Sequence, residues 1–153
     1  MRKWLSNTGI VALAAIAAMA GAEERGTPAE AKAMLAKAVS HYAAVGRKQA
    51  LADFTARKAP FGERDLYVFC ISSDRVLVAS GGYPARVGTS ADLLKDAQGK
   101  PLRQALWDAG SHDGGGSLEY MHLNPASLKP EPKISFVQKL GDDVCGVGAY
   151  KAK

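Results

Sequence analysis

The sequence predicts an α+β domain: one antiparallel sheet of about five strands, covered by a long N-terminal helix and by short crossover helices. Three observations lead to this prediction. Apolar residues recur at helical spacing within residues 28–55, and the period changes to that of strands from residue 66 onward. Turn residues then divide the strands into a hairpin and a later three-stranded meander. Helices followed by strands that pair in sequence order are typical of an α+β domain.

The first 22 residues form a separate unit. The basic start MRKW precedes an apolar run of about 14 residues, and small residues at 18–20 and 20–22 are typical of cleavage sites. The run is shorter than the ~20 residues that a membrane span needs. We therefore expect residues 1–22 to be a cleaved signal peptide, with an uncleaved anchor as the alternative. Residues 23–153 are then expected to form one exported, periplasmic domain.

The helical part of the sequence begins with a strong start signal. Thr27 is a candidate N-cap, Pro28 suits the first helical position, and Glu30 completes a capping box. Residues 47–56 predict a second, shorter helix. The residues predicted to face inward are Met34, Leu35, Ala38, Val39, Tyr42 and Val45 in the first helix, and Ala50, Leu51 and Phe54 in the second.

The strands are predicted from alternation and from turn residues. Residues 66–72 and 75–80 form a hairpin, and residues 117–123, 133–140 and 143–150 form the meander. Between these groups, residues 90–100 and 101–110 predict short crossover helices. Pro101 suits the start of the second of these helices, and Gly110 suits its end.

Composition and motifs argue against several function classes. The formal net charge is +5, but the basic residues are scattered and do not interleave with aromatic ones, which argues against nucleic-acid binding. The sequence has no nucleophile elbow, no phosphate-binding loop, no dinucleotide fingerprint and no histidines at zinc-ligand spacing. We therefore expect no catalytic residue, no metal site and no cofactor.

Two cysteines, Cys70 and Cys145, lie in strand-like apolar segments. In an oxidising compartment such a pair is read first as a disulfide, with two buried free thiols as the alternative.

Polar side chains on the meander give the best indication of a binding site. Tyr120 and His122 share one face of the third strand, and Lys133 and Ser135 share one face of the fourth. Either this face is half solvated, with the lysine extending to water, or the groups converge on a small ligand within apolar walls. A buried lysine without a partner is costly, and an anionic ligand would relieve that cost.

The order and spacing of four segments resemble the single Cache domains, which are extracytoplasmic relatives of the PAS fold. The segments are AEAKAMLAKAVSHYAAVGRKQALADF, DLYVFCISSDRVLVASGGYPARVGTS, LKDAQGK and GGGSLEYMHLNPASLKPEPKISFVQKLGDDVCGVGAYK. The resemblance implies a PAS-like sheet with its first and last strands adjacent, which would bring Cys70 and Cys145 together as a disulfide. It also implies a pocket between the sheet and the segment that follows the second strand.

The resemblance further implies a ligand-binding sensor for an organic acid, an amino acid or a similar small metabolite. Two departures from the family matter. The chain ends without a membrane helix or signalling module, so we expect a separate membrane receptor or kinase as its partner. His122 stands where relatives often have tryptophan. The implied ligand-binding residues are Tyr83, Tyr120, His122, Lys133 and Ser135, with Tyr67 and Phe69 as possible walls.

The sequence leaves open which face of the first strand lines the pocket. A second hypothesis is an interaction subunit that binds no ligand and docks on a membrane receptor or kinase. That hypothesis requires a filled junction between the sheet and the crossover, and an exposed apolar patch elsewhere.

Overall fold

The computed structural model describes residues 25–152, so the expected signal peptide lies outside the described residues. Within this range no helix is long and apolar enough to cross a membrane. The elements confirm the predicted α+β architecture. In chain order they are α1 (Pro28–Val45), α2 (Arg47–Thr55), β1 (Gly62–Glu63), β2 (Leu66–Ser72), β3 (Leu77–Ser80), the 3₁₀ turns η1 (Pro84–Arg86) and η2 (Ala91–Leu93), α3 (Arg103–Ser111), β4 (Gly116–Asn124), β5 (Lys129–Leu140) and β6 (Asp143–Tyr150).

Helix α1 starts at the predicted capping box. The Thr27 hydroxyl accepts the backbone N–H of Glu30 at 3.2 Å, and the Glu30 carboxylate accepts the backbone N–H of Thr27 at 2.7 Å. This second bond, together with the Arg64 guanidinium, lowers the pKa of Glu30 to about 2. The predicted inward stripe is buried at its centre, but its last residue is not. Val45 is 42% exposed, because Gly46, with φ 85°, turns the chain into α2 immediately after it.

All strand pairs of the sheet are antiparallel, and the main path runs β1-β2-β6-β5-β4, with β3 also paired to β2. The five predicted strands are present, and the two-residue β1 adds a sixth beside the start of β2. Strands β2 and β6 are neighbours, so the first and last long strands of the domain lie side by side at its centre. Cys70 and Cys145 are directly opposite each other in that pair, and they form a disulfide with their Cα atoms 4.0 Å apart.

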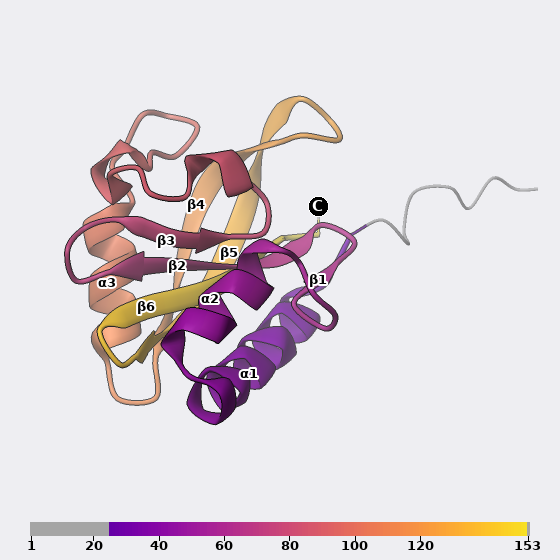
Figure 1. The fold of residues 1–153 in the computed structure, drawn as a ribbon. Helices are drawn as coiled ribbons and strands as arrows, with labels where there is room; N and C mark the ends of the chain where they lie inside the picture. The colour runs from indigo at the N-terminus through magenta and orange to yellow at the C-terminus, as the bar shows by residue number, and fades with distance from the viewer. Residues whose placement is uncertain (1–24, 153) are drawn as a thin grey trace, which may run out of the picture.

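The two faces of the sheet are covered by different segments (Figure 1). Helices α1 and α2 pack on one face, against residues that include Val68, Cys70 and Val147. Helix α3 and the crossover from β3 pack on the other face, where Leu102 and Leu106 belong to a second apolar cluster. Because side chains alternate along a strand, this division assigns Leu66, Val68 and Cys70 to the α1 face, and Tyr67, Phe69 and Ile71 to the crossover face.

The crossover contains less helix than predicted. Residues 90–100 form only the single turn η2, and the rest is held by backbone bonds such as Asp96 N–H to the Lys100 carbonyl at 2.9 Å. Gly110 does not end the second predicted helix, which continues to Ser111. It is instead a packing position, because a Cβ atom there would lie 2.5 Å from Cγ1 of Val144.

Two predicted strand starts are also displaced. Strand β3 begins at Leu77 rather than at residue 75, because Arg75 takes the left-handed conformation with φ 64°. Strand β5 begins at Lys129, four residues earlier than predicted. Its first residues pair only with β4, where Pro130 and Pro132 lie opposite Leu123 and Met121. A proline is tolerated there because its missing N–H can face the unpaired side of the strand.

The disulfide closes a loop of 75 residues and should be a major source of stability. We expect the double variant Cys70→Ala/Cys145→Ala to unfold with a free energy lower by about 4 kcal/mol, since the unfolded chain regains the entropy of the open loop. Urea unfolding of the variant, of the oxidised protein and of the reduced protein provides the measurement. Equal midpoints for the oxidised and reduced protein would contradict this expectation.

Candidate functional site

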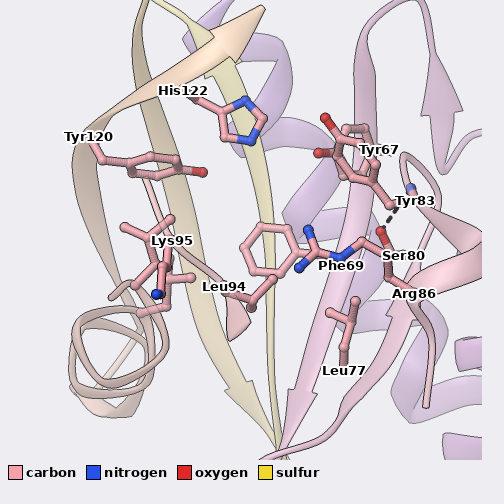
Figure 2. A pocket seen from close by; sticks show the side chains of 12 residues that line it. Tyr67, Phe69, Leu77, Ser80, Tyr83, Arg86, Leu94, Lys95, Tyr120 and His122 are labelled. Atoms are coloured by element: carbon pink, nitrogen blue, oxygen red, sulfur yellow. Dashed lines mark hydrogen bonds between the residues drawn. The ribbon is translucent and has the colours of Figure 1, made fainter. Parts of the chain in front are cut away.

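A cavity lies between the sheet and the crossover, where the sequence predicted a pocket (Figure 2). Its interior has room for about 70 Å³, which is enough for a few water molecules or a ligand of few atoms and is well below the usual range for drug-sized ligands. Its floor and one end are apolar, and its other end is lined by hydroxyl, imidazole and cationic groups. The lining residues are Tyr67, Phe69, Leu77, Ser80, Tyr83, Arg86, Leu94, Lys95, Leu102, Leu106, Tyr120 and His122.

The middle of the sheet carries no side chain on this face at two positions of β6. A Cβ atom at Gly146 would lie 2.7 Å from Cζ of Phe69, and one at Gly148 would lie 2.7 Å from Cε of Lys133. Side chains from β2 and β5 therefore lie flat across bare backbone of β6. This arrangement lets Phe69 form part of the cavity floor and lets Lys133 extend toward β2.

Tyrosine and histidine side chains surround the polar end of the cavity. The Tyr120 hydroxyl is hydrogen-bonded to the buried Ser135 hydroxyl at 2.8 Å. The backbone N–H of Tyr83 donates to Oγ of Ser80 at 3.1 Å, which holds the start of the crossover against β3. Within residues 25–152, the hydroxyls of Tyr67 and Tyr83 have no hydrogen-bond partner, and both residues line the cavity. Two phenolic donors are therefore available to a ligand.

Burial sets the protonation of these groups. It raises the pKa of Tyr67 and of Tyr120, so that both phenols keep their protons at neutral pH. It also lowers the pKa of His122 to about 4, and the nearby charges of Lys133 and Arg86 act in the same direction. The imidazole of His122 is therefore uncharged at neutral pH.

The formal charges around the cavity are positive. Arg86 on η1 and Lys95 on the crossover line it, and no Asp or Glu is among the described residues that do so. In Figure 2 the guanidinium of Arg86 points from the crossover toward the inside of the cavity. Within the described part of the chain, this guanidinium forms no ion pair. The cavity therefore presents hydrogen-bond donors and positive charge without a built-in counter-ion.

Lys133 is buried, with 4% of its surface exposed, but it does not line this cavity. Its ammonium lies 5.1 Å from the ring centre of Tyr67 and 4.8 Å from that of Tyr150, at distances typical of cation–π contacts. It faces an adjoining cavity of about 360 Å³, also lined by Arg57, Asp65 and Asn124. Tyr67 and Tyr83 line both cavities and so form the wall between them.

Burial lowers the pKa of Lys133 to about 8, against a smaller opposing effect of Asp65. No residue in the described range forms a salt bridge or hydrogen bond with its ammonium. A cation held between two aromatic rings keeps its N–H donors available to a ligand, as the sequence suggested for this lysine.

The β4–β5 hairpin that carries His122 and Lys133 is held by a buried carboxylate. Glu131, paired in register with His122, accepts hydrogen bonds from Ser127 at 2.7 Å and Asn124 at 3.1 Å. Arg25 forms an ion pair with it at 2.9 Å. Hydrogen bonds from Ser127 and Asn124 are the main reason that the pKa of Glu131 falls to about 2. The network fixes the hairpin relative to the start of the domain.

The structure thus brings five of the seven predicted ligand residues to one cavity: Tyr67, Phe69, Tyr83, Tyr120 and His122. Ser135 lies beneath Tyr120, and Lys133 faces the adjoining cavity. Sequence reasoning missed Tyr150 and Arg86. Tyr150 shares the parity of Gly146 and Gly148, which could have revealed it, whereas no sequence signal distinguishes Arg86 from the other scattered basic residues.

Within residues 25–152 no group of three or more His, Cys, Asp or Glu side chains is placed to hold a metal ion.

Both the sequence and the fold of this chain are similar to those of known proteins. The sequence profile named single Cache domain 2 matches residues 4–150. The chain belongs to this family. Three solved structures with the same fold are similar to it. A methyl-accepting chemotaxis protein from Vibrio parahaemolyticus has a TM-score of 0.65 and 23% identity, and the match covers 80% of this chain and 86% of that one.

A periplasmic sensor domain of a chemotaxis protein matches this Cache domain with a TM-score of 0.64 and 27% identity, over 81% of this chain and 94% of that one. A Cache chemosensory domain described for its carboxylic acid recognition has a TM-score of 0.57 and 20% identity, over 81% and 88% of the two chains. No curated protein matches the sequence. The Cache family and the PAS-like fold implied by the resemblance are confirmed.

The buried ammonium of Lys133 should reduce the stability of the domain. We expect Lys133→Met to raise the free energy of unfolding at pH 7, by at most about 3 kcal/mol, since a pKa lowered from 10.5 to about 8 measures the penalty of burying the charge. Urea unfolding at pH 7 gives the value, with Lys129→Met, at an exposed position of the same strand, as the control.

The effect of Lys133→Met should depend on pH. Below pH 8 both folded and unfolded protein hold the Lys133 proton, so the full penalty is present. Between about pH 8 and 10.5 the folded protein releases it first, so the parent protein gains stability and the advantage of the variant shrinks. A variant that is less stable than the parent at pH 7 would show that the cation–π contacts outweigh the burial penalty.

Proposed function

We propose that this Cache domain is an exported sensor that binds a small carboxylate in the cavity between the sheet and the crossover. The observation that carries the proposal is the set of unpaired donors that meet there. The hydroxyls of Tyr67 and Tyr83 and the guanidinium of Arg86 face one space, with no acidic side chain lining it within residues 25–152. Hydrogen bonds to a charged group contribute about 1.5–3 kcal/mol each, so such a set favours an anion with several acceptor oxygens.

In this proposal the carboxylate accepts hydrogen bonds from Tyr67 and Tyr83, and Arg86 supplies a positive charge. The apolar residues Phe69 and Leu94 contact the rest of the ligand. Lys133 contributes its charge through the wall that Tyr67 forms, and Tyr120, held by Ser135, shapes the polar end. The size of the cavity favours a ligand of few atoms.

Export and signalling are part of the same proposal. The disulfide supports an oxidising compartment, and the 27% identical relative is a periplasmic domain. A separate membrane receptor or kinase that reads the ligand state stays a prediction. The alternative of a docking subunit without a ligand is not favoured, because it requires a filled junction where the structure has two cavities.

A thermal-shift series tests the proposal. We expect small monocarboxylates to raise the melting temperature by several degrees, since a ligand at 100 times its dissociation constant stabilises by about 2.7 kcal/mol. The matched neutral amides should have no effect. Arg86→Gln should remove most of the shift and Tyr67→Phe should reduce it. Lys129→Gln, which removes one positive charge outside both cavities, should leave the shift unchanged.

Two results would contradict the carboxylate site. One is an equal shift with acids and amides, and the other is an unchanged shift in Arg86→Gln.

A further inference from the structure

A short hydrogen-bond chain behind the cavity fixes where His122 holds its proton. The hydroxyl of Tyr150 lies 3.0 Å from the backbone carbonyl oxygen of Leu123 and 2.9 Å from Nδ1 of His122. A hydroxyl has one proton to donate, and a carbonyl oxygen can only accept. The Tyr150 proton therefore goes to Leu123, and Nδ1 of His122 must donate to the Tyr150 oxygen. The opposite assignment would leave two oxygens facing each other at 3.0 Å with no proton between them.

The other ring nitrogen of His122 is consequently an acceptor. A neutral imidazole has a single proton, and Nδ1 holds it, so Nε2 carries a lone pair. Within residues 25–152 no side chain or backbone group is hydrogen-bonded to Nε2, and His122 is part of the cavity lining. The low pKa of His122, about 4, which follows from burial and from the charges of Lys133 and Arg86, keeps the ring neutral at physiological pH.

The cavity thus offers several donors and one fixed acceptor. A plain monocarboxylate can satisfy Tyr67, Tyr83 and Arg86, but it has no proton for Nε2 of His122. A 2-oxo acid would place a second lone pair against it. An ammonium donor is disfavoured, because the two cations near the ring are Lys133 and Arg86 and no acidic residue of the described chain lines the cavity. The complementary group on a ligand is a neutral hydroxyl.

We propose that the preferred ligand class is a small hydroxy acid, whose carboxylate is held by Tyr67, Tyr83 and Arg86 and whose hydroxyl donates to Nε2 of His122. This inference rests on the proposed function, because it requires that the cavity binds a carboxylate. His122 is then the residue that determines specificity, and Tyr150 is a positioning residue that acts by holding the imidazole proton on Nδ1.

Titration calorimetry with three acids of one carbon skeleton tests the inference: lactate, propionate and pyruvate. We expect lactate to bind about tenfold more tightly than propionate, the effect of one ordinary hydrogen bond, and pyruvate to bind most weakly. His122→Phe should bind lactate and propionate with equal affinity. Tyr150→Phe, which removes the hydrogen-bond partner of Nδ1, should bring the affinities for lactate and pyruvate closer together.

The outcomes separate the two proposals. If none of the three acids binds, the proposed function itself is overturned, and this inference with it. If lactate and propionate bind the parent protein equally well, or if the lactate preference survives in His122→Phe, only the hydroxy-acid inference is overturned.

The position of the proton can be measured without any ligand. Two-bond ¹H–¹⁵N correlation spectra of histidine rings distinguish the two neutral tautomers, and the spectrum of His122→Phe identifies the signals of His122. We expect the ring to carry its proton on Nδ1 in the parent protein, and to populate the Nε2–H form in Tyr150→Phe. An Nε2–H tautomer in the parent protein would overturn the inference directly.

Discussion

The antiparallel pairing of β2 with β6 is the constraint on which both the core and the cavity depend. It joins the first and last long strands of the domain, and its register places Cys70 opposite Cys145 on the face covered by α1. On the opposite face the same register places Phe69 opposite Gly146, where the glycine leaves room for the ring. A shift of one residue would exchange the two faces, moving the disulfide toward the cavity and the aromatic wall into the core.

The glycines of β6 explain how a small domain makes room for a site at the centre of its sheet. With side chains at 146 and 148, the middle strand would fill the space over which Phe69 and Lys133 lie. The resulting surface combines apolar residues with polar and charged groups that have no partner in the described chain. It has phenol donors without partners, a cation between two rings, and an arginine without an acid in the described chain. Burying the unpaired phenol of Tyr67 and the ammonium of Lys133 costs free energy while the cavities are empty, and in the proposed function a bound anion offsets that cost. Arg86 is exposed, so its charge attracts an anion without such a cost. We expect the free energy that these buried groups cost the empty domain to be recovered when a ligand binds.

In the proposed recognition, Tyr150, which does not contact the ligand, acts through the ring of His122. The ring alone could present either a donor or an acceptor to the cavity. Tyr150, at the end of β6, removes that freedom because its own proton is committed to the Leu123 carbonyl. The buried network around Glu131 holds the hairpin that carries His122. The inferred tautomer of His122 therefore follows from the position of β4 relative to β6. Where relatives are expected to have a tryptophan, this chain has a polar group whose hydrogen-bonding role is set by the fold.

The sequence by itself determined the elements whose signals are local. The sequence predicted the capping box at Thr27, the inward-facing apolar residues of α1 and the alternation along β4 and β5. Each of these signals depends on residues within a few positions of one another. The resemblance to Cache domains supplied the order of the sheet, and with it the adjacency of the strands that carry Cys70 and Cys145, a pair that the cysteine count had already suggested. Local signals failed in the crossover, where residues 90–100 satisfy their backbone groups through turns rather than a helix, and at Gly110, whose role is contact with Val144. Only the tertiary structure decided which side chains share a cavity. Lys133 and Tyr120 are opposite each other in register yet line different cavities, and Arg86 joins the cavity from the crossover. These placements, and the proton position inferred for His122, depend on distances between strands and loops far apart in the chain, and no local pattern encodes them.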